Sequence, residues 1–70
     1  MDVKLKIGKR IKELREAANM SQKDLAYTAD LDRSYIASVE NGKRNISIVN
    51  IEKIAVALSV TIKEFFNDGE

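Results

Sequence analysis

The chain has 70 residues, no cysteine, no histidine and a formal net charge of +1. This length suits one small domain, so we expect a single domain over residues 1–70. Without cysteine or histidine, disulfides, thiolate metal sites and the commonest general base are excluded, and we expect no metal, no cofactor and no catalysis. No apolar run approaches the ~18 residues of a membrane span, which predicts a cytoplasmic chain without membrane contact.

The small net charge is distributed unevenly along the chain. Residues 1–44 contain ten Lys or Arg against seven Asp or Glu, a net charge of +3. Residues 45–70 contain two against four, a net charge of −2. A basic part followed by an acidic end would orient the domain in the field of a polyanion. The alternative is ordinary solubility charge.

The first predicted helix begins after residue 2 and ends near residue 18. Asp2 can cap it, and apolar residues recur on one stripe at helical spacing. The stripe consists of Ile7, Ile11, Leu14 and Ala18. Gly8 either permits a close helix contact or is tolerated without purpose. Asn19 suits the left-handed residue that ends a helix.

A second, short helix is predicted to begin after Ser21. Ser21 and Asp24 have the spacing of a capping box, in which the hydroxyl and the carboxylate satisfy unpaired amides of the first turn. The apolar residues of one face are Leu25, Ala26 and Ala29. Tyr27 is expected to be a partly buried packing residue.

Residues 30–32 suit a turn, and a third helix follows them. Asp30 tolerates a left-handed backbone, and Asp32 can cap the new helix. Its inward positions are Tyr35 or Ile36, and Val39. Asn41 and Gly42 then end the helix with a left-handed cap.

A helix, a tight turn and a second helix with a polar outer face form a helix-turn-helix, whose second helix fits the major groove of DNA. Base contacts are therefore predicted for Arg33 and Ser34 at the start of that helix and for Ser38 one turn later. Arg33 could donate two hydrogen bonds to guanine. The alternative is a solvated surface on a short helix pair, which all-α proteins often contain.

Three segments closely resemble the phage Cro and repressor type of helix-turn-helix domain, the XRE-like family. They are residues 7–16 (IGKRIKELRE), 20–26 (MSQKDLA) and 35–44 (YIASVENGKR). The resemblance covers about residues 5–66 and implies a compact, all-α, five-helix bundle of the lambda-repressor-like type. Residues 32–36 and 42–48 look most like the controller proteins of bacterial restriction-modification systems.

The resemblance also implies roles for individual residues. Arg15 and Glu40 match a partly buried ion pair that joins the first helix to the end of the recognition helix. The expected contacts to the DNA backbone come from Gln22, Lys23, Tyr35, Asn41, Lys43 and Asn45. Arg44 either reads a base, enters a minor groove or holds a phosphate. The alternative for each charge is a solvated loop residue.

Two further helices are predicted, begun by Ser47 and Thr61. The core-facing stripe of the first is Ile48, Ile51, Ile54, Ala55 and Leu58. The apolar residues that remain at this end exceed what one core needs, which predicts a two-fold dimer contact within residues 46–67. They are Ile46, Val49, Val56, Val60, Ile62 and Phe66. The alternative is that this end only closes the monomer core, as Phe65 is expected to do.

These patterns predict a transcriptional regulator that binds a pseudo-palindromic DNA operator as a homodimer. The controller resemblance implies control of its own gene and of a restriction endonuclease gene. It also implies two dimers on adjacent sites and RNA polymerase that is either blocked or recruited. The alternatives are a phage or mobile-element repressor, and a protein-interaction module such as an antitoxin.

Overall fold

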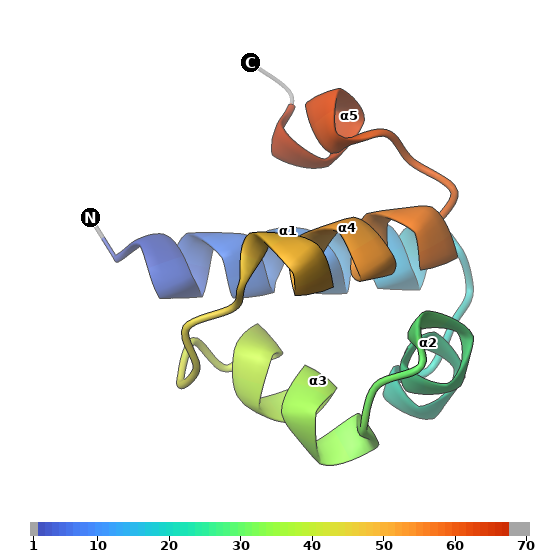
Figure 1. Cartoon of the computed structure of the whole chain (residues 1–70), viewed down its shortest axis with the longest axis horizontal. Coiled ribbons are helices and arrows are strands. Elements are labelled where there is room, and N and C mark those ends of the chain that lie inside the picture. The colour runs from blue at the N-terminus through green and yellow to red at the C-terminus, as the bar shows by residue number, and fades with distance from the viewer. Residues whose placement is uncertain (1, 68–70) are drawn as a thin grey trace.

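The computed structural model describes residues 2–67, which form five α-helices joined by short connections (Figure 1). The helices are α1 (Val3–Ala17), α2 (Gln22–Ala29), α3 (Arg33–Glu40), α4 (Ile48–Ala57) and α5 (Ile62–Phe66). Their number and order are those predicted, and the described residues contain no strand. The all-α fold class is therefore confirmed.

Local capping residues determine where four of the five helices begin. Asp2 accepts hydrogen bonds from two backbone amides of the first turn of α1. Ser21 and Thr61 each form a complete capping box with the acidic residue three positions later. Ser47 accepts from the amide of Asn50 at 3.1 Å. Because these oxygens satisfy amides that no helical carbonyl reaches, the starts of α1, α2, α4 and α5 are encoded locally.

The two capping boxes also perturb their carboxylates. The backbone amide of Ser21, together with its hydroxyl, lowers the pKa of Asp24. Thr61 lowers the pKa of Glu64 in the same way. A carboxylate whose pKa is lower in the folded state stabilises that state above its unfolded pKa. The contribution disappears as the pH falls through the folded pKa.

Residues with a left-handed backbone end three of the predicted segments. Asn19, Asp30 and Gly42 have φ angles of 57°, 59° and 73°. Their short or absent side chains tolerate this conformation. Ser59, at φ 61°, turns the chain between α4 and α5 in the same way and was not predicted to do so.

All five helices contribute to one core. α3 packs against α1 and α2, α4 packs against α2 and α5, and α5 also contacts α1. The buried apolar residues are Ile11, Leu25, Ala26, Ala29, Ile36, Val39, Ile51, Ile54, Ala55, Leu58 and Phe65. Phe65 is fully buried, so α5 closes the core of the monomer.

Two glycines allow backbone segments to approach closely. A Cβ atom at Gly8 would overlap the carbonyl oxygen of Val39 and lie 2.8 Å from that of Glu40, so Gly8 brings the end of α3 against α1. A Cβ atom at Gly42 would overlap the side chain of Leu5. Gly42 therefore packs tightly against α1 at the end of α3.

Four predicted placements were wrong. Ala18 is exposed because α1 ends at Ala17. Ile48 is 66% exposed because the first turn of α4 directs Asn50 and Ile51 toward the other helices instead. Tyr27 is 88% exposed, since it lies on the opposite side of α2 from the buried Leu25 and Ala29. Asp32 occupies the N-cap position of α3, but its side chain makes no capping hydrogen bond.

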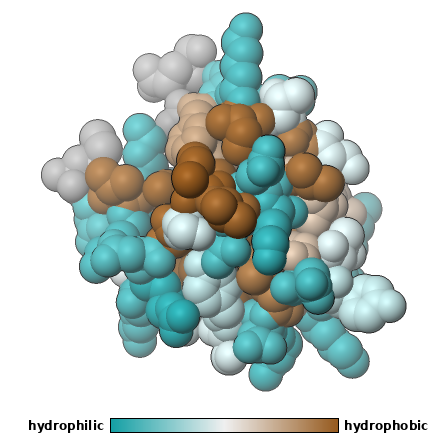
Figure 2. Space-filling model, viewed as in Figure 1, coloured by the Kyte–Doolittle hydropathy of each residue, from teal (hydrophilic) through white to brown (hydrophobic). Residues whose placement is uncertain are grey.

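Exposed apolar side chains gather over α4 and α5 (Figure 2). They are Ile48, Val49, Val56, Ile62 and Phe66, which we call the apolar face. Two other residues predicted for the dimer contact, Ile46 and Val60, are partly buried against the core of the monomer. Within residues 2–67, none of the helices has the length and apolar character needed to cross a membrane.

Candidate nucleic-acid interface

The turn between α2 and α3 sets the angle of the helix pair. The amide of Leu31 donates to the carbonyl of Ala26 at 2.8 Å, which closes the turn behind the left-handed Asp30. Ile36 and Val39 are buried on the inner side of α3. The opposite side of α3 must therefore face solvent, because these two anchors determine its rotation about its axis.

The outer face of α3 presents the residues predicted to contact bases. Arg33 and Ser34 are exposed at the N-terminal end of the helix. Ser38 follows Ser34 by one turn and is half-buried. In Figure 1, α3 lies on the opposite side of α1 and α4 from α5. The recognition residues therefore lie away from α5.

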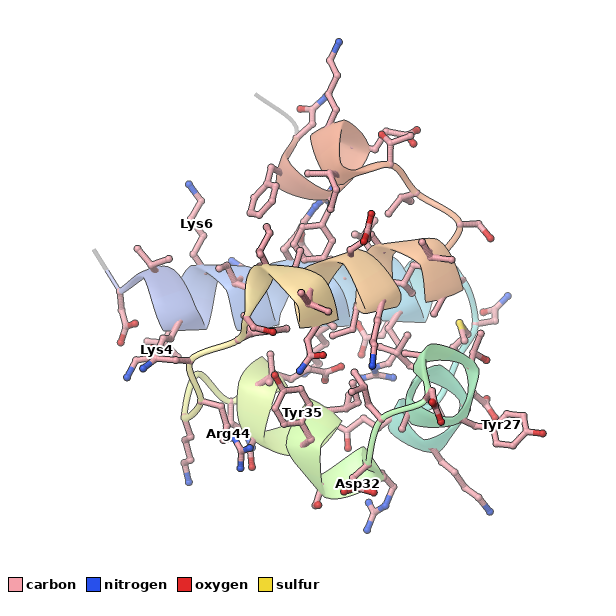
Figure 3. All side chains as sticks on the ribbon, viewed as in Figure 1. Lys4, Lys6, Tyr27, Asp32, Tyr35 and Arg44 are labelled. Atoms are coloured by element: carbon pink, nitrogen blue, oxygen red, sulfur yellow. The ribbon has the colours of Figure 1, made fainter. Side chains whose placement is uncertain are left out.

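Tyr35 and Arg44 come together beside this face (Figure 3). The Arg44 guanidinium carbon lies 4.8 Å from the centroid of the Tyr35 ring. The Tyr35 hydroxyl accepts a hydrogen bond from Nδ2 of Asn50 on α4 at 3.0 Å. Together with the turn before α3, these two side chains line an open groove. Its residues are Asp30, Leu31, Asp32, Ser34, Tyr35 and Arg44.

The loop between α3 and α4 supplies the remaining predicted contacts. Asn41, Lys43, Arg44 and Asn45 are all exposed. The amide of Lys43 donates to the carbonyl of Ser38 at 2.9 Å, so the loop begins in a defined position at the end of α3. Lys23 is exposed in the first turn of α2. The loop and α2 thus place basic side chains on both sides of α3.

The predicted ion pair joins α1 to the end of α3. Nε of Arg15 lies 2.7 Å from Oε2 of Glu40, and the two side chains are only 11% and 3% exposed. A second hydrogen bond, from Nη2 to Oε1 at 3.1 Å, makes the pair bidentate. Hydrogen bonding to Glu40 raises the pKa of Arg15, so the guanidinium stays charged.

Gln22 takes part in this pair. Its side-chain amide donates to Oε1 of Glu40 at 3.1 Å, and Arg15 donates further to the carbonyl of Met20 at 2.8 Å. These hydrogen bonds attach the start of α2 to α3 and to α1. The side chain of Gln22 therefore makes a hydrogen bond within the domain. Its contact with a DNA phosphate stays a prediction.

Sequence reasoning missed two polar residues that join distant segments. Asn50 holds Tyr35 from α4. Arg10 on α1 donates to the backbone carbonyls of Phe65 and Glu64, both at 2.7 Å. These carbonyls at the C-terminal end of α5 have no partner within the helix. The only available signal for Asn50 was its polar side chain in an otherwise apolar turn of α4. No spacing pattern could reveal Arg10, because its partners lie more than 50 residues away.

Comparisons with known proteins agree with this geometry. The family described as helix-turn-helix matches residues 11–65. The control protein C.MunI from a Mycoplasma species is 49% identical over 70 residues, which cover 99% of this chain and 95% of the relative. The restriction-modification controller protein C.AhdI from Aeromonas hydrophila has a TM-score of 0.87 at 49% identity, covering 90% of this chain and 91% of that one.

A second solved structure is similar over almost the whole length. The controller protein C.Esp1396I, a tetramer in complex with its natural 35-base-pair operator, has a TM-score of 0.90 at 37% identity. The match covers 96% of this chain and 88% of that one.

The closed turn before α3, its exposed N-terminal end and the basic loop after it define a helix-turn-helix protein. The chain belongs to the helix-turn-helix family, and it is similar within that family to the restriction-modification controller proteins.

Proposed function

We propose that this protein is a sequence-specific DNA-binding transcriptional regulator that recognises a pseudo-palindromic operator as a homodimer. The observation that carries the proposal is the exposure of Arg33 and Ser34 at the N-terminal end of α3, above the buried anchors Ile36 and Val39. Side chains at this end of a recognition helix reach base edges when the helix enters the major groove. C.Esp1396I, which is similar over nearly the whole chain, was solved on its operator as a tetramer.

The test is selection of duplexes from a random-sequence DNA pool by the purified protein at near-physiological salt. We expect enrichment of an inverted repeat whose half-sites lie about one helical turn, or ~34 Å, apart. An enriched single half-site would contradict the dimer, and no enrichment would contradict sequence-specific binding. We call the most enriched sequence the selected duplex.

The proposed dimer uses the apolar face over α4 and α5. Val56 and Phe66 are 70% and 52% exposed there, whereas α3 lies on the far side of α1 and α4 from α5. Association through this face would leave the recognition residues free. Burial of the same patch on both subunits gives two-fold symmetry, which an inverted repeat requires.

Val56→Asp is expected to convert the dimer to a monomer, because it places two carboxylates into an apolar contact. Sedimentation equilibrium at tens of micromolar measures the association. Tyr27→Asp is the matched control: the same charge is added at an 88% exposed position on α2, away from the apolar face. A dimer that persists in Val56→Asp would show that another surface mediates association.

Lys43→Ala is expected to weaken binding to all sequences alike, since a phosphate contact carries no sequence information. Each neutralised phosphate contributes about −0.9 to the slope of log affinity against log salt, so the two copies in a dimer should flatten the slope by about 1.8. Titrations at several salt concentrations measure this slope. Lys63→Ala on α5 should leave it unchanged, and an altered base preference in Lys43→Ala would assign Lys43 to base reading instead.

The biological role we propose is that of the controller of a restriction-modification system. The similarity to C.MunI and C.AhdI supports this role. A reporter gene placed behind the operator should respond to the protein's concentration. A response that requires a toxin or another protein partner would contradict direct control.

A further inference from the structure

Asn50 is fixed in position by two hydrogen bonds. Its backbone amide donates to the capping oxygen of Ser47 at 3.1 Å, and its side-chain amide donates to the hydroxyl of Tyr35 at 3.0 Å. The side chain is half-buried between α4 and α3. Asn50 therefore connects α4 to Tyr35 in the first turn of α3.

The Tyr35 ring lies between the core, Asn50 and Arg44. The ring packs partly against the core, and its hydroxyl end is held by Asn50. The guanidinium of Arg44 lies over the ring, 4.8 Å from its centroid, at a distance typical of a cation–π contact. Figure 3 shows both side chains on the side of the molecule formed by α3. The Arg44 side chain, although exposed in a loop, thus rests on a surface whose orientation is fixed.

We propose that Asn50 is a positioning residue for DNA recognition, which acts through the Tyr35 ring to orient the Arg44 guanidinium before DNA arrives. A long side chain that is ordered before binding loses less conformational entropy on binding. The Tyr35 hydroxyl accepts from Asn50, so its own hydrogen is free for another acceptor such as a phosphate oxygen. This inference rests on the proposed DNA-binding function.

The experiment is a double-mutant cycle read by fluorescence anisotropy on the selected duplex. Asn50→Ala deletes the hydrogen bond to Tyr35 and should raise Kd about three- to tenfold. Tyr35→Phe deletes the same hydrogen bond together with the hydroxyl that could contact a phosphate, so it should raise Kd at least as much. Asn50→Ala should therefore raise Kd no further in a Tyr35→Phe background, because its hydrogen bond is already absent there. In an Arg44→Ala background, Asn50→Ala should have no further effect.

Two controls separate positioning from folding. Thr28→Ala removes a polar side chain from the exposed surface of α2 and should bind as the wild type does. Thermal unfolding of each variant shows that the domain is folded at the assay temperature. Tyr35→Phe keeps Asn50 in place, so it still tests the pathway if Asn50→Ala lowers the stability of α4.

Three outcomes would overturn the inference. Wild-type affinity in Asn50→Ala would show that the hydrogen bond does not matter for binding. An undiminished effect of Asn50→Ala in the Arg44→Ala background would show that Asn50 acts elsewhere. If the wild-type protein selects no duplex, the proposed function fails and the inference fails with it, whereas the first two outcomes leave the proposed function intact.

Discussion

Arg33→Ala is expected to abolish sequence-specific DNA binding. Arg33 is exposed at the N-terminal end of α3, the part of a recognition helix that reaches base edges. A bidentate arginine–guanine contact is worth about 1–3 kcal/mol of discrimination. A dimer contains two copies, so the affinity for the selected duplex should fall roughly 30-fold to 20,000-fold relative to the affinity for a scrambled duplex.

Fluorescence anisotropy with both duplexes measures this loss. Arg33→Lys is the matched variant, because it keeps the charge but loses the planar fork that can bond two acceptors on one base. Specificity should therefore fall in both variants, while affinity for the scrambled duplex should fall only in Arg33→Ala. An equal loss on both duplexes in Arg33→Ala would assign Arg33 to a phosphate instead.

Glu40→Ala is expected to destabilise the domain by about 3–5 kcal/mol, the usual cost of removing one partner from a buried ion pair. The Arg15 side chain is only 11% exposed, so its charge would lose its partner without reaching bulk water. Gln22 would lose the same acceptor. Because small domains have only about 5–15 kcal/mol of stability, urea denaturation should show a variant close to unfolding.

The surface pair Arg10–Glu13 provides a matched comparison. Nη1 of Arg10 lies 3.6 Å from Oε1 of Glu13, and the Glu13 side chain is 51% exposed. Glu13→Ala should therefore lower the free energy of unfolding by less than about 1 kcal/mol. Replacing both Arg15 and Glu40 by apolar residues of similar size should be less damaging than Glu40→Ala, because no charge then remains buried. If Glu40→Ala were no more destabilising than Glu13→Ala, the buried pair would contribute little to stability.

Helix boundaries and turns were predictable because their causes lie within a few residues of one another. Ser21, Thr61 and Asp2 cap the helices that follow them, and Asn19 and Asp30 adopt the left-handed conformation expected at helix ends. Hydrogen bonds between a cap and an amide three positions later need no distant partner.

The inner face of α3 was also predictable. Ile36 and Val39 are buried, as helical spacing indicated, and their burial leaves Arg33 and Ser34 outside. Local sequence thus specified which side chains a recognition helix would expose. The chain's resemblance to the helix-turn-helix family added the Arg15–Glu40 pair, whose partners lie 25 residues apart and which no local pattern could show.

Burial and polar contacts between helices were settled only by the tertiary structure. Ile48 has the spacing of a core residue but is 66% exposed, because the first turn of α4 directs Asn50 and Ile51 toward the other helices instead. The contacts of Arg10 with α5 and of Asn50 with Tyr35 depend on the packing of helices distant in sequence. Periodicity identifies the apolar side of a helix. The neighbouring helices determine how much of that side is buried and which polar side chains contact one another between helices. Local sequence thus specified five helices and an exposed polar face on the third, whereas the packing of the helices decided how Tyr35 and Arg44 are held beside that face.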